Sequence, residues 1–288
     1  MKILIIGGDG RLGLVGERLS SDGHSVYAYK NASENTEQIS DLSSVSQFDT
    51  VILPLPVSRD GEHINIPDFP DEKIVISELF ASIPKGKTIL AGKICRAHKE
   101  KAKDFGLRVK DYYEKESFTD ENAYITAEGA LNIAASKQRK TLRHSHHLII
   151  GGGRIARHLL LLLRGYGARV TLLARNTHDL CWAEAIGAVP LDLLGESEDI
   201  ERALSECSVI YNTVPEKVLS DAACEFIKSD TLYIELVGDD TLISPSIAKK
   251  CSCAVCAKAL PNKYAPESAG LLLYKTISEI LKEMVNEK

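Results

Sequence analysis

Aromatic residues are scarce in this chain. Of its 288 residues, 6% are Phe, Trp or Tyr, and only one is Trp, so the core has to be built mainly from aliphatic side chains. Uninterrupted apolar stretches are also short, and none reaches the roughly 18 uncharged residues that a membrane span needs. The apolar run at residues 1–7 is too short for a signal peptide. We therefore expect a soluble, cytoplasmic protein with no membrane partner.

The chain also lacks a block of basic residues. It has 35 Lys and Arg residues against 40 Asp and Glu residues, which gives a formal net charge of −5 at pH 7. A mildly acidic protein is a poor general ligand for a phosphate backbone, because like charges repel. Nucleic acid is therefore not expected as a partner.

The chain has seven cysteines. Because an odd number cannot pair completely within one chain, this count argues against a secreted disulfide scaffold. Three of them lie close together at Cys251, Cys253 and Cys256. No second cluster of ligands accompanies them, and Cys is common in protein cores. We therefore expect no metal site.

The two halves of the sequence begin alike. Residues 4–8 and residues 148–152 both read Leu-Ile-Ile-Gly-Gly, and an Arg and a periodic apolar segment follow each copy. A strand, a glycine turn and a helix in this order open a nucleotide-binding βαβ unit. A single repeat at this wide spacing predicts two α/β domains and not a solenoid.

Short β-branched runs alternate with helical segments in both halves, which predicts parallel sheets covered on both faces by helices. The segment that starts at Asn122 is rich in Ala, Leu and Glu and ends in cationic residues, as a long helix would. Residues 55–72 are expected to form a long loop, which in compact domains is often functional. The predicted fold is two Rossmann-like, doubly wound α/β domains joined by the long helix, with the C-terminal helix packed back on the first domain. The expected boundaries are 1–121 for the substrate-side domain, 122–143 for the linking helix, 144–265 for the cofactor-binding domain and 266–288 for the C-terminal helix.

The second glycine turn has the pattern G-x-G-x-x-A directly after a strand. Its first glycine permits the tight turn, its second lets a pyrophosphate approach the backbone, and the small third residue lets helix and strand pack closely. The helix N-terminus then offers free N–H groups to the phosphates. A purely structural glycine turn is the alternative. We predict a dinucleotide site formed by Gly151, Gly152, Gly153, Arg154, Ile155 and Ala156.

The first glycine turn fits this pattern less well. Its formal match begins at Gly8, one residue late after the strand. In the frame aligned with the strand end, Asp9 replaces the second glycine, and its carboxylate would oppose a pyrophosphate. We interpret this turn as shaping a cleft, with a second nucleotide site or plain loop geometry as alternatives.

The end of the next strand bears on the choice of cofactor. NAD sites usually carry an Asp or Glu here that binds the ribose hydroxyls, whereas this strand ends at Ala174 with no acid. An Arg in this place can form charge-assisted, bidentate bonds to a 2′-phosphate. An ordinary exposed Arg is the alternative. We predict NADP, bound by Arg175, Asn176 and Thr177.

Other cofactor-binding candidates follow later strands, because ligands of open α/β sheets bind at the carboxyl ends of the strands. Thr213, Val214 and Pro215 follow the fourth predicted strand of the second half, and Pro261 follows the sixth.

Several short segments occur in an order and spacing that resemble a known family, the dehydrogenase-like A chain of dipicolinate synthase. They are Gly7-Gly8-Asp9 with Arg11, Thr126-Ala127-Glu128-Gly129, Gly151 to Arg154, Ala174-Arg175, Asn212 to Pro215, and Pro261 with Ala265-Pro266-Glu267. The resemblance implies a fold like that of the 2-hydroxyacid and alanine dehydrogenases, and NADP as cofactor. It further implies oxidation of a dihydro- or hydroxytetrahydropyridine-2,6-dicarboxylate to dipicolinate in spore formation. The second, flavoprotein-like subunit of dipicolinate synthase is the implied partner, and we also expect a homo-oligomer.

Two loops depart from the family pattern. Residues 235–240 replace a strand end and a Pro-Gly-Gly turn, and residues 262–264 lack an expected glycine. Both loops lie near the nicotinamide end of such a fold. Glu235 and Pro261 are therefore kept as candidates for contact with the cofactor.

The reaction implied by the resemblance needs a base and groups that hold two carboxylates. Glu128, expected near the start of the linking helix, is the candidate base, with a carboxylate favoured by the helix dipole as the alternative. Thr126 is a candidate hydrogen-bond donor. Arg11 and Arg59 are the candidates for binding substrate carboxylates, although each could be an ordinary surface Arg.

Two other functions share these motifs. A 2-hydroxyacid or amino-acid dehydrogenase of the same fold would need a His–acid pair in the loops of the catalytic domain, and the sequence shows no convincing pair. A regulatory protein that binds NADP(H) without catalysis would need only the dinucleotide site.

Overall fold

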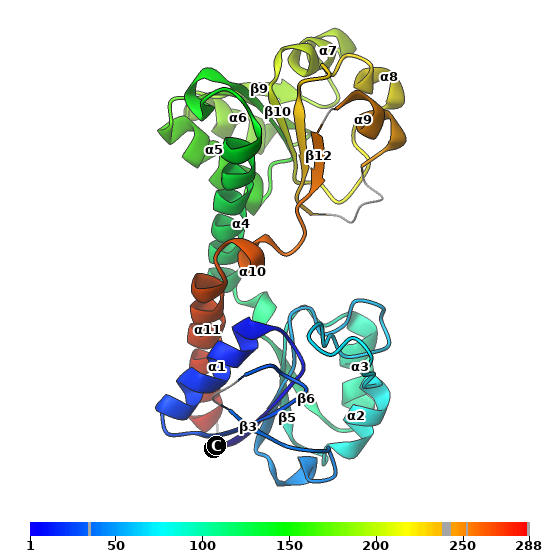
Figure 1. Ribbon diagram of the computed structural model, residues 1–288, viewed down its shortest axis with the longest axis vertical. Coiled ribbons are helices and arrows are strands. Elements are labelled where there is room, and N and C mark those ends of the chain that lie inside the picture. Colours follow the sequence, from blue (N-terminus) through cyan, green and yellow to red (C-terminus); the bar gives the residue numbers. More distant parts are fainter. Residues whose placement is uncertain (34–35, 238–242, 252, 287–288) are drawn as a thin grey trace. The chain divides into compact units, whose positions relative to one another are not determined.

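The computed structural model describes residues 1–33, 36–237, 243–251 and 253–286. The chain forms two compact units. Unit 1 comprises Met1–Asn122 and Ala265–Lys288, and unit 2 comprises Ala123–Tyr264. Unit 1 is therefore assembled from both ends of the sequence, as the blue and red segments of Figure 1 show.

Unit 1 contains a parallel sheet of six strands in the order β3-β2-β1-β4-β5-β6. The central strand β1 is almost entirely buried from Ile3 to Ile6, as expected for a parallel sheet with both faces covered. The strand order reverses between β1 and β4, which is where such sheets bind ligands. The strands are β1 Lys2–Ile6, β2 Ser25–Tyr29, β3 Glu37–Gln38, β4 Thr50–Ile52, β5 Thr88–Ala91 and β6 Arg108–Asp111.

Helices and short 3-10 turns complete the N-terminal part of the chain. They are α1 Gly10–Ser21, η1 Val45–Gln47, α2 Ile76–Ser82, α3 Arg96–Asp104, η2 Tyr112–Glu114 and α4 Glu116–Lys137, the last of which continues into unit 2. No strand or helix interrupts residues 53–75. The long loop expected at residues 55–72 is therefore present, although it extends slightly further at both ends.

The C-terminal helix α11 (Pro266–Asn286) belongs to unit 1 and lies beside α1 in Figure 1. Its apolar face joins the same core cluster as the buried residues of α1; this cluster includes Leu12, Val15, Leu19, Leu273, Ile277, Ile280 and Leu281. At Gly270 the two helices are in direct contact, since a Cβ atom there would lie 3.4 Å from the side chain of Leu14. The prediction that the C-terminal helix packs back on the first domain is confirmed.

Unit 2 repeats the architecture of unit 1. Its six parallel strands have the order β12-β11-β10-β7-β8-β9, which is the same doubly wound arrangement. The strands are β7 His146–Ile150, β8 Arg169–Ala174, β9 Val189–Asp192, β10 Val209–Asn212, β11 Leu232–Glu235 and β12 Cys253–Cys256. The helices and the 3-10 turn are η3 Leu142–His144, α5 Arg154–Gly165, α6 Thr177–Ala185, α7 Ser197–Glu206, α8 Asp221–Cys224, α9 Pro245–Lys250 and α10 Leu260–Tyr264.

The long helix differs from the predicted one in its position. It begins at Glu116 and ends at Lys137, whereas residues 122–143 were expected. Residues 116–121 are mostly polar, so the sequence gives no apolar periodicity from which the earlier start could be predicted. Phe118 among them is buried and packs in the core of unit 1. The residues after Lys137 form a turn and the 3-10 turn η3 before β7 begins.

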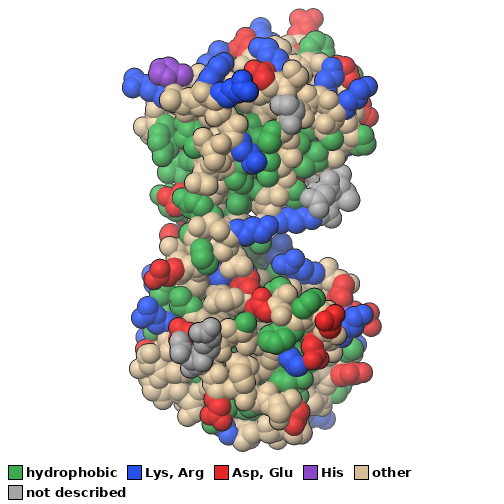
Figure 2. All heavy atoms as spheres, viewed as in Figure 1, with side chains coloured by type: hydrophobic (Ala, Val, Ile, Leu, Met, Phe, Trp, Pro, Cys, Tyr) green, Lys and Arg blue, Asp and Glu red, His purple; other side chains and the backbone are tan. Residues whose placement is uncertain are grey.

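Acidic and basic side chains are interspersed on the face of unit 1 that Figure 2 shows. In the part of the chain that the structure describes, no helix is both long enough and apolar enough to cross a bilayer.

The packing of α11 on α1 gives a stability prediction. Ile277 is fully buried in this contact, so Ile277→Ala should lower the free energy of unfolding by about 2–5 kcal/mol through lost burial and a new cavity. The melting temperature, followed by circular dichroism, measures the loss. Val285→Ala, on the same helix but 56% exposed, should change stability by less than about 0.5 kcal/mol. Equal effects of the two substitutions would contradict the observed packing.

Candidate functional site

The glycine turn of unit 2 lies at the carboxyl end of β7. Gly151 has φ +106°, which favours glycine. A Cβ atom on this residue would lie 2.5 Å from Thr213 Oγ1 and 2.8 Å from Val214 Cγ2. The Thr213 hydroxyl donates to the Ile150 carbonyl at 2.8 Å. The structure therefore brings together two of the predicted segments, the glycine turn and the loop after β10.

The last glycine of this turn leaves room for a ligand. Gly153 is the N-cap residue of α5 and provides no side-chain cap, and a Cβ atom there would meet nothing within 4 Å. Within the described residues, no hydrogen bond engages the N–H groups of Gly152 and Gly153. Open N–H groups at a helix N-terminus favour an anion. Ala156 is fully buried, which lets α5 pack closely on the sheet.

The residues after β8 present a cation and a helix cap. Arg175 is exposed. Asn176 caps α6, because its side-chain oxygen accepts the backbone N–H of His178 at 2.9 Å. Thr177, the first residue of α6, is exposed as well. Arg175 therefore has a freely accessible guanidinium, whereas the side-chain oxygen of Asn176 is committed to the helix.

An acid that the sequence analysis missed also lies at this turn. A Cβ atom on Gly152 would collide with the carboxylate of Asp179, from the first turn of α6. This carboxylate accepts a hydrogen bond from Arg157 Nη2 at 2.8 Å, and the Arg157 guanidinium also lies over the Trp182 ring. The positive charge of Arg157 thus compensates the negative charge of Asp179. Its position five residues after the strand concealed it, because a search for a ribose-binding acid examines the strand end.

Glu235 is a fully buried carboxylate at the end of β11. It accepts hydrogen bonds from Asn212 Nδ2 at 2.7 Å and from the backbone N–H of Val237 at 3.2 Å. Burial and this carboxylate raise the pKa of Tyr233, whose hydroxyl also faces Glu235. Glu235 therefore links the ends of β10 and β11. Residues 238–240, which belong to the loop that differs from the family pattern, lie outside the described residues.

The predicted base lies elsewhere on its helix than expected. Glu128 is half-buried in the middle of α4, not in its first turn, so a dipole effect on its carboxylate does not apply. Thr126 is buried. The neighbouring Gly129 accommodates α10, since a Cβ atom there would lie 3.2 Å from Tyr264 and 3.3 Å from Leu260. Pro261 is a buried residue of this same helix and not part of an open loop.

The glycine turn of unit 1 is covered by its own long loop. The Gly8 N–H donates to the Asn65 carbonyl at 2.9 Å. Gly7 has φ +67°, and a Cβ atom on it would lie 2.5 Å from Ile66. Asp9 caps α1 by accepting the Arg11 backbone N–H at 3.2 Å. The backbone and the helix N-terminus that a pyrophosphate would use are therefore already occupied.

Arg11 is largely committed to this turn. Its guanidinium forms two hydrogen bonds with the Asp9 carboxylate, at 2.9 Å and 2.8 Å, and a third with the Leu55 carbonyl at 3.2 Å. Only 9% of the residue is exposed. Its charge is compensated, which reduces its capacity to bind a substrate carboxylate.

Arg59, by contrast, is exposed and lines a cavity of about 260 Å³ in unit 1. Residues 59–73 of the long loop form this cavity. The loop follows β4, whose carboxyl end lies at the switch point of the sheet. Of the two predicted substrate-binding arginines, Arg59 thus lines a cavity, and no described residue forms an ion pair with it.

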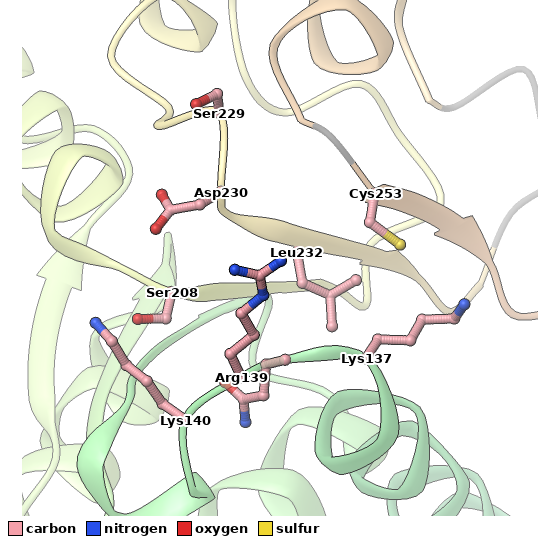
Figure 3. A pocket seen from close by; sticks show the side chains of 9 residues that line it. Lys137, Arg139, Lys140, Ser208, Ser229, Asp230, Leu232 and Cys253 are labelled. Atoms are coloured by element: carbon pink, nitrogen blue, oxygen red, sulfur yellow. The ribbon is translucent and has the colours of Figure 1, made fainter.

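A further cavity, of about 470 Å³, lies in unit 2. Figure 3 shows Lys137, Arg139 and Lys140 on one side of it, with Ser208, Asp230 and Leu232 opposite. Ser208 and Asp230 precede β10 and β11, so this cavity lies at the amino ends of the strands. It is therefore separate from the glycine turn, which lies at their carboxyl ends.

No group of three His, Cys, Asp or Glu side chains is arranged to hold a metal ion among the residues that the structure describes. The seven cysteines all lie within the described residues, and none of them forms a disulfide.

Comparison with known proteins identifies similarity over the whole chain. Residues 2–113 match a family model described as the N-terminal domain of the dipicolinate synthase A chain. The dipicolinate synthase A chain of Bacillus subtilis (strain 168) is 23% identical over 300 residues, which covers 100% of this chain and 98% of that protein.

Solved structures show the same fold. The crystal structure of the Bacillus subtilis dipicolinate synthase A chain has a TM-score of 0.84 at 22% identity, covering 100% of this chain and 98% of that one. The corresponding structure from Bacillus halodurans has a TM-score of 0.82 at 20% identity, with 97% of each chain covered. An L-alanine dehydrogenase has a TM-score of 0.61 at 13% identity, covering 99% of this chain and 90% of that one. The dehydrogenase-like, two-domain α/β fold and the resemblance to the dipicolinate synthase A chain are thus both confirmed.

Proposed function

We propose that the protein is an oxidoreductase subunit that oxidises a reduced pyridine-2,6-dicarboxylate to dipicolinate with NADP, in spore formation. The observation that carries this proposal is the open glycine turn of unit 2 with the exposed Arg175 beside it. The similarity to the dipicolinate synthase A chain supports the substrate class. The name of that relative, one of several subunits, also supports a partner, which we propose to be the flavoprotein-like subunit of dipicolinate synthase. We propose a homo-oligomeric state as well.

The residues of unit 2 fit a dinucleotide. The N–H groups of Gly152 and Gly153 and the N-terminus of α5 would hold the pyrophosphate, and Arg175 would hold a 2′-phosphate. Thr213 and Val214 close one side of the turn, and Glu235 fixes the adjacent strand ends through Asn212. When bound, the nicotinamide supplies the hydride acceptor.

Asp179 is the main argument for NAD in place of NADP, because a carboxylate near the glycine turn can accept ribose hydroxyls. Its pairing with Arg157 at 2.8 Å compensates this charge. Arg175 has no such partner among the described residues. We therefore retain NADP.

A dehydrogenase acting on an amino acid or a 2-hydroxy acid is the second candidate. Such an enzyme needs a His–acid pair, which the sequence does not reveal. The structure contains one in the long loop of unit 1, where His63 Nδ1 lies 2.8 Å from Asp60 Oδ2. Absorbance of the reduced nicotinamide separates the two candidates. We expect NADP reduction with a reduced pyridine dicarboxylate in the presence of the partner subunit, and none with alanine or lactate. The reverse preference would reject the dipicolinate proposal.

The open turn predicts that Gly153→Asp abolishes NADP binding without unfolding the chain. The new carboxylate has room, since nothing lies within 4 Å of its Cβ position, but it would repel the pyrophosphate. Isothermal titration calorimetry measures the loss. Gly10→Asp is the matched control, because Gly10 begins α1 and is equally open. A comparable loss of affinity in this control would place the cofactor in unit 1.

The accessible guanidinium predicts a cofactor-specific effect of Arg175→Ala. Charge-assisted hydrogen bonds contribute roughly 1.5–3 kcal/mol each, so NADP affinity should fall about ten- to a hundredfold. NAD affinity should change little, because NAD lacks the 2′-phosphate. Titrations of both cofactors at two salt concentrations test this, and salt should weaken NADP binding more in the wild type than in the variant. Equal losses for both cofactors would show general damage to the adenosine pocket.

A further inference from the structure

The long loop of unit 1 contains a turn built around one carboxylate. Asp60 Oδ1 accepts the backbone N–H groups of Glu62 at 2.9 Å and His63 at 2.8 Å, and the Ser58 hydroxyl at 3.0 Å. These hydrogen bonds, that of the His63 N–H foremost, hold the pKa of Asp60 well below its usual range. Asp60 is therefore ionised at neutral pH, and an ionised carboxylate can only accept hydrogen bonds.

The second oxygen of this carboxylate determines the proton positions on His63. Oδ2 lies 2.8 Å from His63 Nδ1. Because the ionised carboxylate only accepts, Nδ1 carries the proton, and the neutral ring keeps a lone pair on Nε2. No hydrogen bond engages Nε2 within the described residues, and the side chain is 19% exposed. A fixed tautomer with an accessible basic nitrogen is what a general base requires.

The ring is not needed to hold the loop in place. Asp60 already binds two backbone N–H groups and a hydroxyl without it, and Asn65 is fixed by the bonds Gly8 N–H to Asn65 O and Asn65 N–H to Val57 O. A purely structural role for the imidazole is therefore poorly supported.

His63 and Arg59 line the same cavity of about 260 Å³. Lys73 contributes a second cation, and Ile64 and Phe69 contribute apolar walls. The carboxylate of Glu72, which also borders the cavity, is paired with Lys30. The Asp60 carboxylate also borders the cavity, but it is engaged by His63, which leaves Arg59 and Lys73 to face a flat ring that carries two carboxylates. The cavity follows β4 at the switch point of the sheet, where ligands of this architecture bind.

We infer that this cavity binds the cyclic dicarboxylate and that His63 Nε2 accepts its ring proton, with Asp60 as the positioning residue. The inference rests on the proposed function. For a dihydropyridine dicarboxylate with a ring N–H group, Nε2 takes the proton of that group, and the electron pair of that bond enters the ring as it becomes aromatic. When bound, the oxidised nicotinamide dinucleotide would supply the acceptor for the hydrogen and electron pair of the ring C–H bond that breaks. The imidazolium then returns its proton to water.

Turnover with the partner subunit present is the first test. His63→Gln should lower kcat by about 10²–10⁴-fold, with NADP affinity unchanged and dipicolinate affinity within about threefold. Asp60→Asn should lower kcat as well, because its amide would donate to Nδ1 and shift the proton to Nε2. His98→Gln is the control: His98 contacts the same loop, at Gly61 O, but does not line the cavity. Wild-type turnover in His63→Gln would overturn the proposal.

Nitrogen NMR of the holoprotein with labelled histidine provides a second readout that does not depend on activity. We expect Nδ1 of His63 to be protonated in the wild type and unprotonated in Asp60→Asn. Saturating dipicolinate should shift the His63 signals and leave those of His98 in place. Arg59→Ala should weaken dipicolinate binding about tenfold.

The failure of the two proposals can be distinguished. If the wild type binds NADP but turns over no reduced pyridine dicarboxylate, the proposed function fails. The NMR titration with dipicolinate then tests by itself whether the cavity binds a cyclic dicarboxylate. Unshifted His63 signals at saturating dipicolinate would overturn the inference, whether or not the enzyme is active.

Discussion

The hydrogen bond from the Gly8 N–H to the Asn65 carbonyl makes the glycine turn of unit 1 different from that of unit 2. Both units have the same strand order and the same glycine turn after the first strand. In unit 1 the long loop covers the turn, and Asp9 occupies the helix N-terminus. In unit 2 the equivalent position, Gly153, is open. One loop thus removes a backbone anion site from unit 1 and, in the same stretch of chain, creates a side-chain cavity.

The candidate residues differ in whether a neighbouring side chain of opposite charge compensates their charge. Arg11 and Asp179 each lie at a glycine turn, and each is held by an ion pair, to Asp9 and Arg157 respectively. Arg175 directly follows β8 in unit 2, Arg59 lies in the long loop after β4 in unit 1, and both are exposed. A ligand anion gains more from a cation without an internal partner, because it then displaces only water.

The sequence predicted the fold well, because the repeated Leu-Ile-Ile-Gly-Gly pattern depends only on neighbouring residues. It failed where a residue's environment is set by distant segments. His147 is fully buried, with its ring stacked on Tyr211 from β10, and its own sequence neighbours do not indicate this contact. The His63–Asp60 pair depends on a turn within a long loop, for which neither helical nor strand periodicity gives a signal. Asp179 reaches Gly152 only because α6 begins immediately after a short connection.

The assembly of unit 1 from both chain ends has a consequence for synthesis. Unit 2 is a continuous segment and is complete when Tyr264 has left the ribosome. Unit 1 at that moment still lacks α11, so the apolar residues Leu12, Val15 and Leu19 of α1 have no cover from Ile277 and its neighbours. The order of translation therefore favours folding of the second unit before the first. The apolar face of α1 therefore stays without its cover until α11 has been synthesised.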